Sequence, residues 1–277
     1  MSECTGLYFS ENATYKEVAL FNPVNINTGI TLYEVLRIQD GICLFLEDHL
    51  QRLQESIQLS GVNYTVILPW IRDMLKGLMR LNGFPYGNIK IVLQFLSGSQ
   101  PSFYTFFIPH SYPTPALYKN GVNTALFTAI RSNPNVKRPL PEVGERASDL
   151  IRTENIYEAL LVNEEGSITE GSKTNVFFVQ GELIYTPPGD QVLKGITRKK
   201  VFELCNQLNF KLIEMSISTN KLTELDAAFL TGTSPKILPI RRIGSITYPV
   251  THPIIKALTK AYEDLIAAYI QQQGNSY

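Results

Sequence analysis

The stretch EGSKTNVFFVQGELIYTPPGDQVLKGITR, residues 170–198, says more about the fold than any other part of this chain. It opens with a carboxylate and a cluster of hydroxyl and amide side chains, and two short apolar runs then predict two strands. A helical pattern follows, with Thr197 as its expected cap and with the N–H groups of Ile196 and Thr197 facing the turn. Because a helix start of this kind binds phosphate, the stretch predicts an anion site.

Helical and strand patterns alternate on both sides of this stretch, which indicates a mixed α/β fold. The prolines of NPNVKRPLPEV predict extended backbone at 133–143. A second glycine turn, Thr231-Gly232-Thr233-Ser234-Pro235, follows an apolar strand. The expected elements of this domain are strands at 121–130, 157–163, 174–180, 182–186, 211–216, 226–231 and 236–241, and helices at 145–155, 197–208, 219–224 and 253–271.

The N-terminal part predicts a smaller α/β domain. Asp40-Gly41 divides 30–45 into a hairpin, because this pair supplies the positive φ of a tight turn. Helices at 46–59 and 64–81 and strands at 88–96 and 102–108 follow. Three prolines at 109–120 predict a connection without regular structure. We therefore expect domains at 1–110 and 121–277, joined by a linker at 111–120.

Composition favours a small-molecule ligand over a polymer. A chain of 277 residues suits two domains, and small ligands often bind between domains. The 25 basic residues balance the 25 acidic ones, so no net charge attracts nucleic acid or anionic lipid. The start of the chain lacks the features of a leader, and no run approaches the roughly 20 apolar residues of a membrane span. We expect a soluble protein that binds neither nucleic acid nor membrane.

The three cysteines, Cys4, Cys43 and Cys205, are widely separated. Their number and spacing fit neither a disulfide framework nor a set of metal ligands. We therefore expect a reducing, cytoplasmic environment and no metal.

Two further motifs accompany the opening stretch. His49-Leu50-Gln51-Arg52-Leu53 lies on the first predicted helix, and Glu158-Ala159-Leu160-Leu161 lies on a predicted strand. With these motifs the chain resembles the class IV (fold-type IV) pyridoxal-phosphate enzymes, which include branched-chain and D-amino-acid aminotransferases and aminodeoxychorismate lyase. The resemblance is loose over 1–110 and close over 157–241. It implies a two-domain fold with the cofactor at the domain interface, in a homodimer.

The resemblance assigns a role to each matching residue. Arg52 would bind the phosphate of pyridoxal 5′-phosphate, and Glu170 would keep the pyridine nitrogen protonated, with Asn175 and Phe177 completing that motif. His49 has no chemical role in this assignment. Further cofactor contacts would come from Leu193 on the ring and, around the phosphate, from Gly195, Ile196, Thr197, Gly232 and Thr233. Tyr33 and Ser234 could face the substrate.

The nucleophile of such an enzyme is a lysine, because an amine can hold the cofactor as a Schiff base and move the Cα proton. Composition does not choose among the lysines. In relatives this lysine precedes the E-A-[LI]-L strand by a fixed distance, and counting back 21 residues from Glu158 gives Lys137. The alternatives are Lys173, Lys194 and Lys236.

Two departures from the family pattern affect the chemistry. Glu142 stands where relatives have a tyrosine, and its carboxylate would need an arginine partner such as Arg138 or Arg146. The strand IKIVLQFLSG also lacks the T-R-G ending that carries a carboxylate-binding arginine in relatives.

The resemblance implies transfer of an amino group from a branched-chain or D-amino acid to a 2-oxo acid. A lyase that releases pyruvate and 4-aminobenzoate from 4-amino-4-deoxychorismate is the alternative within the family. A non-catalytic homologue that binds pyridoxal phosphate is the alternative from another class.

Overall fold

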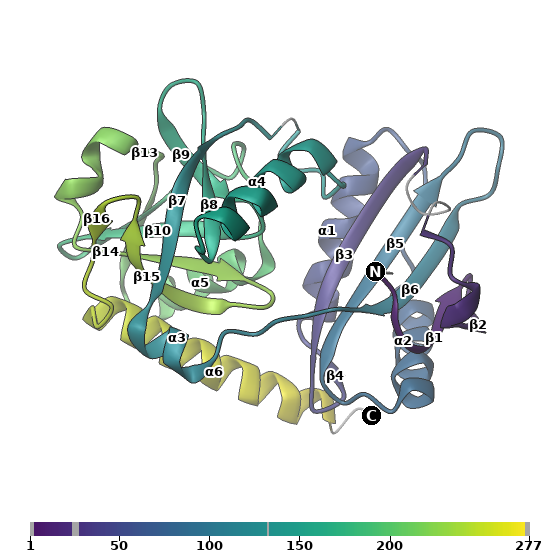
Figure 1. Ribbon diagram of the computed structural model, residues 1–277. Coiled ribbons are helices and arrows are strands. Elements are labelled where there is room, and N and C mark those ends of the chain that lie inside the picture. Colours follow the sequence, from purple (N-terminus) through teal and green to yellow (C-terminus); the bar gives the residue numbers. More distant parts are fainter. Residues whose placement is uncertain (1–2, 24–27, 132, 275–277) are drawn as a thin grey trace. The chain divides into compact units, whose positions relative to one another are not determined.

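The computed structural model describes residues 3–23, 28–131 and 133–274 (Figure 1). They form two compact units. Unit 1 comprises Met1–Ser111, Val136–Pro139 and Ile266–Tyr277, and unit 2 comprises Tyr112–Asn135 and Leu140–Leu265. The sequence placed 136–139 and 266–277 with the second domain, whereas both belong to unit 1. Contacts between residues far apart in the chain decide this assignment, and no local pattern reports them.

Unit 1 is built on an antiparallel sheet whose strand order, in the described residues, is β2-β1-β6-β5-β3-β4. The predicted hairpin at 30–45 is confirmed, with Asp40 at φ 53° and Gly41 at φ 74° in its turn. The strands are β1 (Thr5–Glu11), β2 (Thr14–Glu17), β3 (Ile30–Gln39), β4 (Ile42–Cys43), β5 (Gly87–Phe95) and β6 (Ser102–Ile108).

The hairpin of β1 and β2 was not predicted from the sequence. Its two turn residues, Asn12 and Ala13, have φ values of 50° and 64°. Asparagine adopts this left-handed conformation readily, but alanine rarely does, so the dipeptide carries only half of a hairpin signal.

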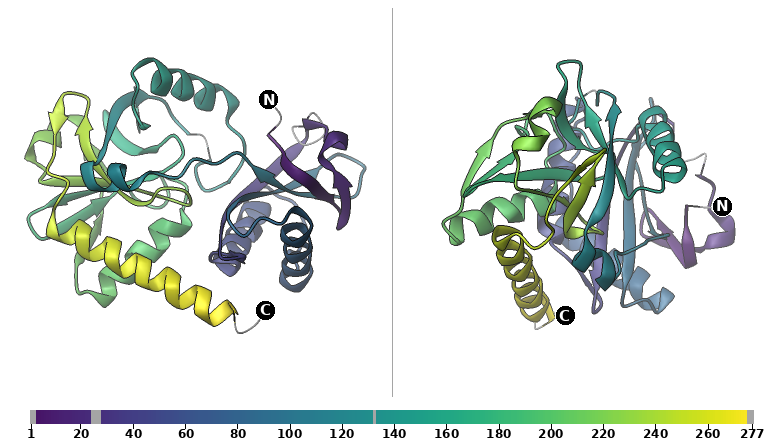
Figure 2. Two further views of the ribbon diagram at one scale, coloured as in Figure 1. Left: turned by 60° about the horizontal axis from the view of Figure 1, so that its bottom comes forward. Right: turned by 60° about the vertical axis from the view of Figure 1, so that its left-hand side comes forward.

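Two helices cover one face of this sheet, α1 (Leu46–Leu59) and α2 (Leu68–Asn82), as both Figure 1 and Figure 2 show. The bounds of α1 agree with the prediction. Helix α2 starts later than the predicted residue 64, at Leu68, because Pro69 in its first turn favours a helix start there. Leu53 and Ile57 of α1 are fully buried in the apolar core between helices and sheet. A short 3₁₀ helix, η1 (Val18–Leu20), follows β2.

Unit 2 contains a curled, mixed sheet with the order β12-β11-β10-β14-β15-β7-β8-β9-β13 in the described residues, and β16 pairs with β15. Strands β9, β13 and β16 were not predicted as strands. The bounds are β7 (Val122–Thr128), β8 (Glu158–Val162), β9 (Ser167–Gly171), β10 (Asn175–Gln180), β11 (Leu183–Thr186), β12 (Lys211–Glu214), β13 (Ile217–Ser218), β14 (Ala227–Gly232), β15 (Lys236–Ile243) and β16 (Ile246–Thr247).

The helices of unit 2 depart from prediction mainly where prolines occur. Pro141 was expected to prevent helix, but it lies in the first turn of α4, where its missing N–H costs nothing. Pro115 likewise opens a short helix inside the expected linker. The bounds are α3 (Pro115–Asn120), α4 (Pro141–Thr153), α5 (Ile196–Gln207), η3 (Thr219–Glu224) and α6 (Pro253–Gly274), whose end from Ile266 onward belongs to unit 1.

A buried aromatic pair holds strands β10 and β14 together. Phe177 of β10 and Phe229 of β14 face each other in register, with stacked rings whose centroids are 4.9 Å apart. Stacking of this kind adds to the burial energy of both rings. It fixes the end of β10 at which Asn175 lies.

Two sequence expectations concern the chain as a whole. All three cysteines are buried and none forms a disulfide bond, and burial raises the pKa of each thiol to about 12. Among the described residues, no helix is both long enough and apolar enough to cross a membrane.

Candidate active site

A buried polar cluster joins β3 to α1 in unit 1. Glu34 on β3 lies on the same buried face as Leu32 and Leu36 and therefore faces the helix, where His49 and Arg52 lie one turn apart. Arg52 donates from Nε to Oε1 of Glu34 at 2.8 Å and from Nη2 to Oε2 at 2.5 Å. His49 Nδ1 donates to the same Oε2 at 2.7 Å. The two carboxylate oxygens therefore hold the guanidinium from one side, in bidentate geometry.

The protonation of this cluster follows from burial and charge. Burial opposes ionisation of Glu34, but the charge and hydrogen bonds of Arg52, together with His49, outweigh it and lower the pKa of Glu34 to about 2. Burial lowers the pKa of His49 below its usual 6.5, and the positive charges of Arg52 and Lys137 act in the same direction. Glu34 is thus ionised at pH 7, and His49 is a neutral donor.

Acidification is expected to destabilise the protein through this cluster. The folded pKa of Glu34 lies below its ordinary value of 4.5, so its contribution is complete above pH 4.5 and is lost as the pH falls toward about 2. At about 1.4 kcal/mol per pKa unit, the loss is about 3 kcal/mol. His49 adds to it from pH 6.5 downward, because the unfolded chain then binds a proton that the folded chain does not. Urea unfolding at pH 7, 5 and 3.5 measures the effect.

The variant Glu34→Gln isolates the contribution of the carboxylate. It is expected to be less stable at pH 7 but to lose less stability between pH 5 and 3.5 than the wild type. Equal losses in both proteins would mean that other carboxylates cause the acid sensitivity.

Lys137 lies in the segment Val136–Pro139, which belongs to unit 1 although the residues before and after it belong to unit 2. Its carbonyl oxygen accepts a hydrogen bond from Tyr33 N at 3.1 Å, and its own N–H donates to Ser56 Oγ at 3.2 Å. Its Nζ lies 4.8 Å from the centroid of the Tyr33 ring. The structure thus brings Lys137 and Tyr33 together, within the same unit as Arg52.

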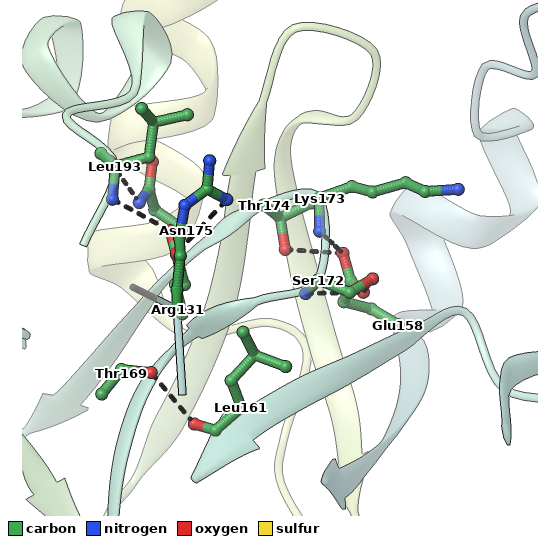
Figure 3. Close-up of polar contacts among 10 residues, drawn as sticks. Arg131, Glu158, Leu161, Thr169, Ser172, Lys173, Thr174, Asn175 and Leu193 are labelled. Atoms are coloured by element: carbon green, nitrogen blue, oxygen red, sulfur yellow. Dashed lines mark hydrogen bonds and ion pairs between the residues drawn. The ribbon is translucent and has the colours of Figure 1, made fainter. Parts of the chain in front are cut away.

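Glu170 is the penultimate residue of β9 in unit 2 and is 2% exposed. Its Oε2 accepts a hydrogen bond from Leu193 N at 3.1 Å, and its Oε1 lies 3.6 Å from Arg131 Nη1. The Asn175 side chain, in turn, donates to the Leu193 carbonyl oxygen at 2.8 Å (Figure 3). Both main-chain polar groups of Leu193 are therefore fixed by side chains of this site, and Leu193 stays beside the Glu170 carboxylate.

A second buried carboxylate shapes the turn that follows Glu170. Glu158, 3% exposed, accepts five hydrogen bonds among the described residues, from its neighbour Ala159 and from Ser172, Lys173 and Thr174 (Figure 3). Donors from three consecutive turn residues converge on it, so the turn between β9 and β10 has one conformation. The sequence used Glu158 only as a landmark for counting, and its role in the turn was missed.

The start of α5 has the features of an anion site. Gly195 is the N-cap and makes no side-chain cap, and no acidic residue lies in the first turn. The expectation that Thr197 caps the helix is wrong, because the helix already begins at Ile196; the Thr197 hydroxyl lies 3.4 Å from that of Tyr262. A Cβ on Gly195 would come within 2.0 Å of Asn175 Oδ1, so only glycine allows this close approach. The first N–H groups of α5 keep the positive end of the helix dipole.

The second glycine turn lies beside the turn that Glu158 holds. A Cβ on Gly232, at the end of β14, would meet the Pro235 ring at 3.2 Å and Thr174 Cγ2 at 3.6 Å. Thr233 and Ser234 occupy the turn between Gly232 and Pro235. Unit 2 thus contains the predicted residues Glu170, Leu193, Gly195, Ile196, Thr197, Gly232, Thr233 and Ser234, and unit 1 contains Tyr33, Arg52 and Lys137.

The competing lysines have other surroundings. Lys173 and Lys194 are exposed, and Lys236 forms an ion pair with Glu263, with nitrogen–oxygen distances of 2.8 and 2.9 Å.

Glu142 is exposed in the first turn of α4, and the guanidinium of Arg146 lies 5.0 Å from the Phe127 ring centroid. Arg146 is thus engaged by an aromatic ring instead of the expected carboxylate.

These donor and acceptor sets fit an aldehyde cofactor that carries a phosphate and a basic ring nitrogen. A half-buried amine can hold the aldehyde, a helix start and a buried guanidinium suit a phosphate, and a buried carboxylate suits a protonated ring nitrogen. Comparison with known proteins agrees with this chemistry. Residues 31–243 match the family model of amino-transferase class IV.

The chain belongs to this family. The class IV aminotransferases are pyridoxal-phosphate enzymes. Two curated relatives are the aminodeoxychorismate lyase of Bacillus subtilis, 26% identical with 89% of each chain covered, and the D-alanine aminotransferase of Bacillus licheniformis, 26% identical with 79% of this chain and 81% of the relative covered. A solved Escherichia coli branched-chain amino acid aminotransferase has the same fold, with a TM-score of 0.82, 19% identity and 95% of each chain covered.

Several residues of the candidate site were missed from the sequence. Glu34, Ser56 and Glu158 are polar and lie in predicted strands or helices with apolar residues, and Arg131 lies just after a predicted strand. A buried polar residue must find a partner, so their position in apolar stripes was a usable signal. The partner itself could not be named, because it lies on another element.

Proposed function

We propose that this protein is a pyridoxal-phosphate-dependent aminotransferase that moves an amino group from an amino acid, of the branched-chain or D-amino acid class, to a 2-oxo acid. Bound pyridoxal phosphate supplies an electron sink for the bond that breaks at the substrate's Cα. The protein's own residues bind and orient the reactants and move protons.

Lys137 provides the amine in this proposal. Lys137 would hold the cofactor covalently through Nζ, and as a free amine it would take the Cα proton at Nζ and deliver it again. A lysine suits both tasks because a neutral amine is a nucleophile and a base. Two main-chain hydrogen bonds of Lys137 support this assignment, because the one accepted from Tyr33 N and the one donated to Ser56 Oγ hold the backbone from which the amine projects.

Glu170 holds a proton on the ring nitrogen in this proposal. Its carboxylate is buried, it lies against the main chain of Leu193, and Leu193 would pack on the ring whose nitrogen the carboxylate faces. Arg131, 3.6 Å away, favours the ionised carboxylate. The buried Glu170 carboxylate beside Leu193 is the single observation that best supports the proposal, because a protein that bound only a phosphate group would not need a carboxylate for a ring nitrogen.

The phosphate would bind at the start of α5, with Gly232 and Thr233 as further contacts and Arg52 as the counter-charge. Glu34 accepts hydrogen bonds from Nε and Nη2 of Arg52 and so orients the guanidinium. The neutral His49 orients the Glu34 carboxylate. Tyr33 and Ser234 are proposed to face the substrate.

Dependence on an oxo-acid acceptor tests the proposed reaction. The holoprotein is incubated with L-leucine, L-valine or D-alanine, with and without 2-oxoglutarate, and the products are quantified by mass spectrometry. We expect a 2-oxo acid and glutamate in equal amounts, with sustained turnover only when the acceptor is present. Failure with every donor, in protein that has bound the cofactor, would contradict the proposal and favour the non-catalytic homologue.

The lyase reaction is a second candidate, favoured by the similarity to the aminodeoxychorismate lyase over nearly the whole length of both chains. This reaction needs no acceptor. Release of pyruvate and 4-aminobenzoate from 4-amino-4-deoxychorismate, at a rate that 2-oxoglutarate does not change, would replace transamination as the function.

A further inference from the structure

The segment that carries Lys137 is an isolated piece of unit 1. Residues 136–139 belong to unit 1, whereas 112–135 before them and 140–265 after them belong to unit 2. So short a segment has no regular structure of its own, and its place in unit 1 depends on side contacts. Val136 supplies one of these, as it is 8% exposed and lies in the apolar core of unit 1.

The main-chain N–H and carbonyl groups of Lys137 supply the other contacts that hold this segment in unit 1. Its carbonyl oxygen accepts from Tyr33 N, on the side of β3 that does not pair with β5, and its N–H donates to Ser56 Oγ. The bond to Tyr33 is between main chains, so nearly any residue at position 33 could form it. The bond to Ser56 depends on one hydroxyl.

Ser56 is an unusual residue for its place on α1. It is fully buried, next to Ile57 and one turn after Leu53, both also fully buried, on the helix face that packs against the sheet. A hydroxyl in such a place costs free energy unless it forms hydrogen bonds, and alanine would suit both the helix and the core better. The hydroxyl therefore has a task beyond packing, and the Lys137 N–H is the partner that lies on another segment.

We infer that Ser56 is a positioning residue for Lys137: its hydroxyl fixes the lysine backbone, and through it the place from which the amine attacks. Because both main-chain groups of Lys137 are then tied, the side chain leaves α1 and β3 in one direction, and its Nζ lies 4.8 Å from the Tyr33 ring centroid. A displacement of the reacting amine by about 1 Å can cost as much as 100-fold in reactivity. This inference rests on the proposed function.

The test compares two ligands that differ only in whether they need the amine. Pyridoxal phosphate forms a covalent bond with the lysine, and pyridoxamine phosphate binds at the same place without one. In Ser56→Ala we expect the dissociation constant of pyridoxal phosphate to rise about 10-fold, while that of pyridoxamine phosphate changes less than about 2-fold. If both constants rise together, Ser56 has only a general structural role, and the inference fails. It also fails if neither constant changes.

Two further variants guard against trivial explanations. Ser60→Ala removes a hydroxyl from the end of the same helix, where it donates to the Ser56 carbonyl oxygen at 2.7 Å, and both constants are expected to stay within about 2-fold. Ser56→Cys keeps nearly the same volume but replaces the oxygen with a weak acceptor, so it should behave like Ser56→Ala even if the alanine variant folds poorly. Wild-type affinity for pyridoxal phosphate in Ser56→Cys would contradict the inference.

Two measurements separate this inference from the proposed function. Hydrogen exchange at the Lys137 amide needs no cofactor and should be faster in Ser56→Ala than in wild type or Ser60→Ala; equal exchange would overturn the role of the hydroxyl. Wild-type protein that binds neither ligand would refute the proposed function, whatever the exchange data show about Ser56.

Discussion

Replacing Lys137 with alanine is expected to lower turnover by at least about 1,000-fold. The variant loses both the covalent attachment of the cofactor and the base at Cα, and proton transfer alone contributes roughly 100-fold to 10,000-fold in enzymes. The fold should survive, because the bonds from Tyr33 and to Ser56 involve only the main chain of this residue. Single-turnover kinetics with the preferred donor, together with thermal unfolding, measure the two effects.

Lys173→Ala is the matched control. Lys173 is exposed in the turn after β9, and only its main-chain N–H bonds to Glu158. Its turnover is expected to stay within about 2-fold of wild type. Added methylamine should restore part of the activity of Lys137→Ala by acting as a free base, and it should not affect Lys173→Ala. Full activity in Lys137→Ala would remove this lysine from the mechanism.

Glu170→Gln is expected to lower turnover by about 100-fold with little loss of cofactor affinity. The amide oxygen can still accept the hydrogen bond from Leu193 N, so the site keeps its shape, but a neutral amide does not hold a proton on the ring nitrogen. Steady-state kinetics and cofactor titration separate these two effects.

Glu165→Gln provides the control for loss of one negative charge. Glu165 is exposed in the turn before β9 and is expected to keep wild-type turnover within about 2-fold. Wild-type turnover in Glu170→Gln would show that the carboxylate has no part in the chemistry. An equal loss of turnover and cofactor affinity would reduce Glu170 to a binding residue.

Local sequence patterns correctly predicted the helices and turns that depend only on residues close together in the chain. The hairpin at Asp40-Gly41 and the bounds of α1 were predictable because a turn dipeptide and an apolar stripe specify them without help from the rest of the chain. Proline rules erred in one direction: Pro115 and Pro141 were read as helix breakers although both stand in the first turn of a helix. The turn of β1 and β2 gave too weak a signal because Ala13 adopts a left-handed conformation.

The candidate site was predictable only in part. Family motifs named Arg52, Lys137 and Glu170, but the residues that hold them could not be identified from spacing. Glu34 binds Arg52 from another element, and Ser56 and Lys137 are 81 positions apart in the chain. His49 was given no role, since its partner lies on β3. A contact of this kind depends on how segments pack, and the sequence states only that a buried polar group must have some partner.

Reduction with borohydride tests the central claim most directly. The purified protein is loaded with pyridoxal phosphate and reduced, and the modified peptide is identified by mass spectrometry. The account predicts a pyridoxyl adduct on Lys137 and none on Lys173, Lys194 or Lys236. An adduct on one of those lysines would place the nucleophile elsewhere, and protein that forms no adduct after reconstitution would contradict the proposed chemistry.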